Sequence, residues 1–79
     1  MIKVLLFGAA ADRAGTREVD LPVDDGTLGE LWPLLVDRHP GLVPMRDTLA
    51  FAVNGEYARM DAGVASGDEV AVLPPVSGG

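Results

Sequence analysis

One segment of this sequence predicts a helix, and strand-like segments lie on both sides of it. Thr27 and Glu30 have the spacing of a capping box, in which each side chain bonds the backbone N–H of the other residue. Apolar residues then recur at helical spacing at Leu28, Leu31, Leu35 and Val36. A single helix among strands restricts the fold to a sheet with one helix packed against it.

The helix is expected to run for about three turns and to close at His39-Pro40-Gly41, since proline and glycine commonly follow a helix end. Pro33 lies inside this segment. Proline has no N–H to donate, so it should kink the helix or delay its regular start.

Strands are predicted from alternation and from residues that favour extended backbone. Asn54-Gly55 predicts a tight hairpin, because both residues tolerate the positive φ of a type I′ turn. Two segments rich in glycine or turn residues, 8–15 and 61–68, are expected to be a loop and a turn-rich connection. The predicted strands are residues 2–7, 16–21, 49–53, 57–58 and 69–73.

The resulting order is strand, strand, helix and then three strands. We therefore expect an α+β protein with the β-grasp arrangement, in which a mixed sheet has one main helix on one face. Residues 1–74 should form this domain, and residues 75–79 a flexible C-terminal tail, because the last strand ends at Pro74-Pro75.

Composition excludes several classes of protein. The sequence has 79 residues, enough for one domain, and it has no cysteine for a disulfide or a thiolate metal site. Its net charge is -6 and its six basic residues are scattered, which argues against a nucleic-acid partner. We expect neither a signal peptide nor a membrane span, and a cytoplasmic location.

Strand alternation separates two faces of the sheet. The face predicted to meet the helix is uniformly apolar, whereas the opposite face has only two charged residues and is not the polar surface that solvent favours. Phe7 and Leu73 mark the opposite face as a docking surface, although self-association or simple tolerance of small residues would also fit. The helix-side set is Ile2, Val4, Leu6, Leu49, Phe51, Val53, Val70 and Val72, and the opposite set is Lys3, Leu5, Phe7, Ala50, Ala52, Glu69, Ala71 and Leu73.

No catalytic constellation is apparent in the sequence. The single histidine, His39, falls at the expected helix end, where a structural role is favoured, and no residue cluster predicts a metal site. The remaining unusual group is the carboxylate of Gly79, behind Gly78. Two glycines can enter a channel too narrow for other residues, and adenylation by an enzyme would make the carboxylate reactive toward sulfur. A loose terminus or a cloning remnant is the alternative.

Three segments resemble a known family: Val53-Asn54-Gly55-Glu56-Tyr57, Ser66-Gly67-Asp68-Glu69-Val70, and Leu73-Pro74-Pro75-Val76-Ser77-Gly78-Gly79. They are similar to the small subunits of molybdopterin synthase, and the opening strand extends the resemblance over the whole chain. The resemblance implies that an E1-like enzyme uses ATP to adenylate Gly79. A sulfur donor then forms a thiocarboxylate, and the large subunit uses it to convert cyclic pyranopterin monophosphate to molybdopterin.

The resemblance also assigns residue roles. Gly79 would carry the adenylate and then the sulfur, with Gly78 beside it, and the chain would bind no cofactor and have no catalytic side chains of its own. Family members often carry a basic residue in the loop after the first strand; here Ala9-Ala10-Ala11 precede Arg13, which puts an ionic contact from this loop in doubt. The implied partner-binding residues are Phe7, Tyr57, Leu73, Pro74, Pro75, Val76 and Ser77.

Other functions remain open from the sequence. A terminal Gly-Gly is shared with sulfur carriers for thiazole or cysteine synthesis and with ubiquitin-like modifiers that are conjugated to lysine. A plain interaction domain is a third possibility.

Overall fold

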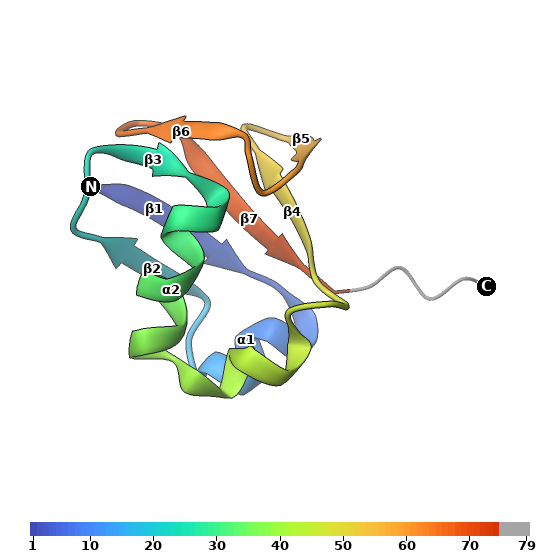
Figure 1. Ribbon diagram of the computed structural model, residues 1–79. Helices are drawn as coiled ribbons and strands as arrows, with labels where there is room; N and C mark the ends of the chain where they lie inside the picture. The colour runs from blue at the N-terminus through green and yellow to red at the C-terminus, as the bar shows by residue number, and fades with distance from the viewer. Residues whose placement is uncertain (75–79) are drawn as a thin grey trace.

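A five-stranded mixed sheet forms the centre of the fold, and helix α2 crosses one of its faces (Figure 1). The structure is a computed structural model that describes residues 1–74. The strand order is β2-β1-β7-β4-β5, with β1 and β7 parallel and the other neighbours antiparallel. This arrangement confirms the α+β, β-grasp prediction. The strands are β1 (Ile2–Leu6), β2 (Glu18–Leu21), β4 (Ala50–Val53), β5 (Glu56–Ala58) and β7 (Glu69–Leu73).

Helix α2 (Leu28–Arg38) begins at the predicted capping box. The Glu30 N–H donates to Thr27 Oγ1 at 3.2 Å, and the Thr27 N–H donates to Glu30 Oε1 at 2.9 Å. Pro33 does not delay the start, because the helix is regular from Leu28 and continues through the proline. Pro33 is exposed, and so is Gly29, whose carbonyl cannot receive a helical bond from the proline.

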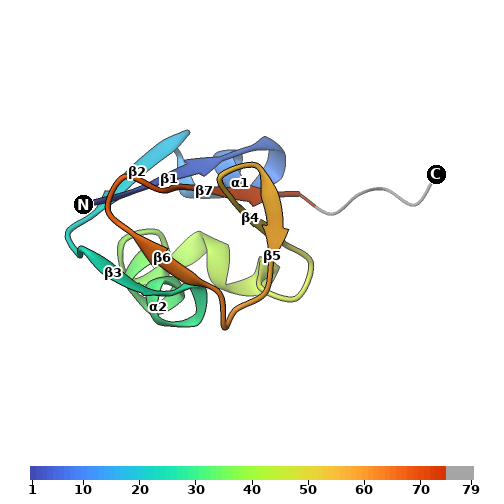
Figure 2. The same ribbon diagram turned by 90° about the horizontal axis from the view of Figure 1, so that it is seen from above.

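The core lies between α2 and the main sheet, as Figure 2 shows with the sheet seen nearly on edge. The buried face of α2 is formed by Leu28, Leu31 and Leu35. Of the eight residues predicted to face the helix, Val53 is partly buried and the other seven are buried. Trp32 anchors the helix to the sheet, since its ring meets Phe51 edge to face at 5.8 Å.

The prediction of a loop at residues 8–15 is wrong, because the structure has a helix there, α1 (Gly8–Ala14). The alanines between the two flanking glycines are strong helix formers, and Ala10 is fully buried against the core. Gly15 ends the helix in the left-handed conformation at φ 75°, and its N–H donates to the carbonyl of Ala11 at 2.8 Å.

The connection predicted at 61–68 contains a further strand. β6 (Gly63–Ala65) pairs with β3 (Asp25–Thr27) in a separate two-stranded sheet, and the sequence predicts neither strand. Three residues are too few to show alternation, and both strands contain glycine. The chain also continues beyond α2 into a 3-10 helix, η1 (Pro40–Met45), which begins with proline at its first position.

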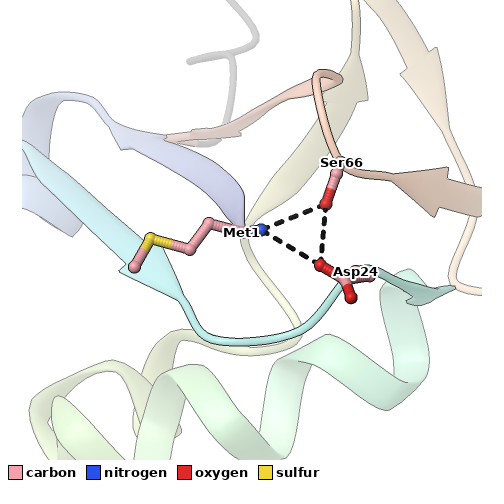
Figure 3. A network of polar contacts seen from close by, with 3 residues as sticks. All are labelled: Met1, Asp24 and Ser66. Carbon is pink, nitrogen blue, oxygen red and sulfur yellow. Dashed lines mark hydrogen bonds and ion pairs between the residues drawn. The ribbon is translucent and has the colours of Figure 1, made fainter.

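Polar contacts join the start of β1 to this small sheet (Figure 3). The amino group of Met1 lies 3.0 Å from Ser66 Oγ and 3.4 Å from Asp24 Oδ1, and Ser66 Oγ donates to the same carboxylate oxygen at 3.2 Å. The Ser66 N–H also donates to the carbonyl of Asp24 at 2.7 Å. The two sheets are therefore held together at the end of the molecule where β1 begins.

Candidate functional site

The described chain leaves the main sheet at the end of its middle strand. β7 ends at Leu73, and Pro74 is the last described residue. The Pro74 ring lies close against Gly8: a Cβ placed on Gly8 would lie 3.0 Å from Pro74 Cγ. Gly8 itself has φ +54°, a conformation that favours glycine. The position from which the C-terminal segment departs is therefore fixed by a close backbone-to-ring contact.

Phe7 and Leu73 lie beside the end of β7, where the chain leaves the sheet, as predicted. The parallel pairing of Leu6 with Val72 places the next residues of the two strands side by side, and the Phe7 N–H donates to the carbonyl of Val72 at 3.1 Å. Phe7 is 44% exposed, a large fraction for a phenylalanine in a folded domain. Leu73 is half-buried.

On the side of the main sheet away from α2, small apolar side chains join Leu73 to Tyr57. Register pairs Ala50 with Leu73 and Ala52 with both Ala71 and Tyr57. Ala52 is only 6% exposed but is not part of the core cluster. Tyr57 is 73% exposed on the edge strand β5. We call this surface, formed by Phe7, Leu73, Ala50, Ala52, Ala71 and Tyr57, the apolar face.

A pocket of about 410 Å³ adjoins the apolar face beside Phe7. Its lining combines apolar side chains with the charged residues Asp12 and Arg17. Arg13, the basic residue singled out in the sequence, lies in the last turn of α1 and is not part of the lining. Arg17 lines this pocket together with Phe7. The predicted strand 16–21 includes Arg17, whereas β2 begins only at Glu18. The remaining lining residues are Leu5, Leu6, Gly8 and Ala11.

Two of the segments that carry the family resemblance, 53–57 and 66–70, are joined by hydrogen bonds and have a structural role. Asn54 Nδ2 donates to Asp68 Oδ1 at 3.1 Å, and Asn54 Oδ1 accepts from the Glu69 N–H at 2.9 Å. The Ala65 N–H donates to Asp68 Oδ2 at 2.9 Å, and this bond together with that from Asn54 lowers the pKa of Asp68. Asn54 and Gly55 have φ of 51° and 85°, which confirms the predicted hairpin turn.

The other residues singled out in the sequence either have a structural role or lie in residues 75–79, outside the described part of the chain. His39 Nδ1 donates to the carbonyl of Ala14 at 3.1 Å, which ties the end of α2 to α1. In residues 1–74, no three His, Asp or Glu side chains are grouped to hold a metal ion, and no helix is long and apolar enough to cross a membrane. The predictions for Pro75, Val76, Ser77, Gly78 and Gly79, and for a tail at 75–79, fall outside the described residues.

The site therefore consists of the apolar face and, beside it, Pro74, which is packed against Gly8 and is followed in the sequence by the segment that ends in Gly78-Gly79. Against known protein families, residues 4–79 match the model of the ThiS family. The chain belongs to the ThiS family.

Relatives extend the match over nearly the whole length of this ThiS-family chain. The human "Molybdopterin synthase sulfur carrier subunit" is 37% identical over 83 residues, covering 99% of this chain and 93% of the relative. "Small archaeal modifier protein 1" of Haloferax volcanii is 40% identical over 83 residues, covering 94% and 95%. The crystal structure of that archaeal protein superposes with a TM-score of 0.87 at 38% identity, covering 99% of this chain and 98% of the other. The resemblance to molybdopterin synthase small subunits is confirmed.

Proposed function

We propose that this ThiS-family protein is a sulfur carrier and acts as the small subunit of a molybdopterin synthase. The observation that carries the proposal is the position of the apolar face: it lies where the chain leaves the sheet toward Gly78 and Gly79. A partner that binds Phe7 and Leu73 is thereby placed next to Pro74, the residue after which the chain continues to Gly79. The names of the human and Chlamydomonas reinhardtii relatives, 37% and 40% identical, support this choice.

The proposed chemistry takes place on the carboxylate of Gly79. A carboxylate oxygen attacks the α-phosphate of ATP on an activating enzyme, and pyrophosphate leaves. Sulfide released by a donor then attacks the acyl carbon, AMP leaves, and a thiocarboxylate remains. The large subunit of the synthase transfers this sulfur to cyclic pyranopterin monophosphate, water supplies the oxygen that replaces it, and the carboxylate is regenerated for another cycle in the cytoplasm.

The folded domain contributes recognition and presentation, and the partners contribute catalysis. Phe7 and Leu73 supply apolar contact area, and Tyr57 adds an aromatic ring with a polar hydroxyl, a combination common in protein interfaces. Pro74 and Pro75 favour extended backbone, which lowers the conformational entropy lost when a tail enters a channel. Five tail residues in extended form reach up to about 17 Å, enough to place Gly79 well inside a partner.

The test is intact-mass measurement after incubation with ATP, an E1-like activating enzyme and a sulfur source. The proposal predicts a mass increase equal to the exchange of one oxygen for sulfur. Deletion of Gly78 and Gly79 serves as the control: it should abolish the increase and leave the circular dichroism spectrum and melting temperature unchanged. An unaltered mass for the full chain with an activating enzyme that modifies a known carrier would contradict the proposal.

A second function is favoured by the archaeal modifier among the relatives. That protein is 40% identical, and its fold superposes closely on this chain. In this alternative the activated Gly79 is joined to a lysine amine of a target protein and no sulfur is delivered. The same reaction mixture, supplemented with target proteins, separates the two functions: a carrier gains sulfur, whereas a modifier appears as an isopeptide-linked adduct at lysine.

A further inference from the structure

Lys3 is the one lysine in the sequence. It lies on the same side of the main sheet as the apolar face, at the end where its neighbours on β2 and β7 are acidic. Its Nζ forms an ion pair with Glu18 Oε1 at 2.9 Å. The Lys3 side chain is 53% exposed and that of Glu18 49%, so a second protein molecule can reach both. The chain thus presents one side-chain amine to solvent, already bonded to a carboxylate.

The neighbouring strands add two more carboxylates around this amine. Lys3 pairs in register with Asp20 on β2 and with Glu69 on β7, and residues directly opposite each other share one face of a sheet. Glu18 is the diagonal neighbour on β2 and makes the direct bond. The hydrogen bond to Glu18 and the negative charge of Glu18 raise the pKa of Lys3, desolvation opposes them, and the charges of Asp20 and Glu69 add smaller contributions in the same direction as Glu18. Only an unprotonated amine is a nucleophile, so this arrangement reduces its reactivity.

We propose that Lys3 is the side-chain acceptor on this chain for an activated C-terminal glycine of a second copy, and that the ion pair with Glu18 holds this acceptor in an unreactive form. The inference rests on the proposed activation of Gly79. A protein that carries both an acyl donor and an exposed lysine is exposed to self-conjugation, which would consume the activated species. The carboxylates around Lys3 oppose that side reaction.

The reaction that is held back is acyl transfer from the activated glycine to the amine. The unprotonated Lys3 Nζ attacks the acyl carbon of Gly79 of another molecule and forms an isopeptide bond. The bond from that carbon to AMP, or to sulfur in a thioester, breaks, and AMP or the thiol leaves. The proton lost from nitrogen passes to solvent. Neither oxidant nor reductant is needed.

The test uses a donor activated chemically, so that it does not depend on any activating enzyme. The donor is the Lys3→Arg variant prepared with a thioester of 2-mercaptoethanesulfonate at Gly79. The acceptors are the wild-type chain and the variants Glu18→Gln, Glu56→Gln and Lys3→Arg, each with a free C-terminal carboxylate. The initial rate of isopeptide-linked dimer is measured by mass spectrometry at about pH 8, below the usual pKa of lysine. Peptide mapping separates linkage at Lys3 from linkage at the amino group of Met1.

The Glu18→Gln acceptor should form the Lys3-linked dimer about two- to fivefold faster than wild type, the ratio that corresponds to loss of an exposed ion pair. Glu56→Gln is the matched control, because it removes the same charge from β5 at the opposite edge of the sheet, and its rate should equal that of wild type. Lys3→Arg should give no product at residue 3.

Equal rates for wild type and Glu18→Gln would overturn the proposal, as would equal acceleration by Glu56→Gln. Melting curves of both glutamine variants verify that they are folded, and Glu69→Gln gives a second measurement, with a smaller acceleration expected because Glu69 makes no direct bond to Lys3. Failure here would leave sulfur loading of Gly79 unaffected, and failure of sulfur loading would leave these rates unaffected.

Discussion

The contact between Gly8 and Pro74 offers a sharp test of how the domain positions its C-terminal segment. Replacing Gly8 by alanine acts on the fold in two ways. It forces a residue with a Cβ to adopt φ +54°, and it places that Cβ 3.0 Å from Pro74 Cγ. Pro74→Ala removes the ring carbon involved, so the two variants and their combination form a double-mutant cycle.

The two effects have different expected sizes. Left-handed backbone costs an alanine about 1–2 kcal/mol relative to glycine. Crowding of the added Cβ against the Pro74 ring adds about 1 kcal/mol. Gly8→Ala should therefore lower the free energy of unfolding by about 2–3 kcal/mol, which for a domain of this size lowers the melting temperature by about 8–24 °C. In the Pro74→Ala background its cost should fall to that of the backbone conformation, about 1–2 kcal/mol.

The assay is chemical denaturation of the four proteins followed by circular dichroism. Gly15→Ala is the matched control, because Gly15 also has positive φ, at +75°, but a Cβ there would have no atom within 4 Å. That variant should show the backbone cost alone, in both backgrounds. The reasoning would be refuted if Gly8→Ala were as costly in the Pro74→Ala background as in the wild-type chain, or no more costly than Gly15→Ala.

Three further predictions concern the apolar face, the motif network and the helix cap. Phe7→Asp should weaken binding of the large subunit at least about tenfold, measured by calorimetry. It should change the free energy of unfolding by less than about 1 kcal/mol, since aspartate is a better N-cap for α1 than phenylalanine. Strong destabilisation would mean that Phe7 belongs to the core. Because the pKa of Asp68 is lowered in the folded state from its usual 3.8, its stabilising effect is present above that value and is lost as the pH falls through the lowered pKa. Asp68→Asn should therefore flatten the acid side of the melting-temperature profile, and parallel profiles would contradict this. Thr27→Ala should cost about 1 kcal/mol through loss of the capping bond, measured by denaturation, and an unchanged midpoint would count against the cap.

The sequence could predict the parts of the fold that carry repeated local signals. The capping box and the spacing of Leu28, Leu31 and Leu35 are enough for α2, and alternation is enough for the two faces of the main sheet. The short elements could not be predicted in the same way. α1 has seven residues and is held by burial of Ala10, and β3 and β6 exist only because they pair with each other. Such segments are decided by tertiary contacts, which a single sequence does not display.

The candidate site shows the same division. Alternation is enough to find Phe7 and Leu73, since both are apolar on a face that should be polar. It does not find Arg17 beside Phe7 or the contact of Pro74 with Gly8, because these depend on α1 and on the parallel register of β1 with β7. The surroundings of Lys3 likewise appear only when β2 and β7 are placed on either side of β1.

The most direct test of the proposed function is single-turnover sulfur transfer. The protein carrying a thiocarboxylate at Gly79 is mixed with the large subunit and cyclic pyranopterin monophosphate, and both molybdopterin and the mass of the carrier are followed with time. The proposal predicts that molybdopterin appears while the carrier returns to the mass of the free carboxylate. Loss of sulfur from Gly79 without formation of molybdopterin, or a thiocarboxylate that stays intact beside an active large subunit, would contradict it.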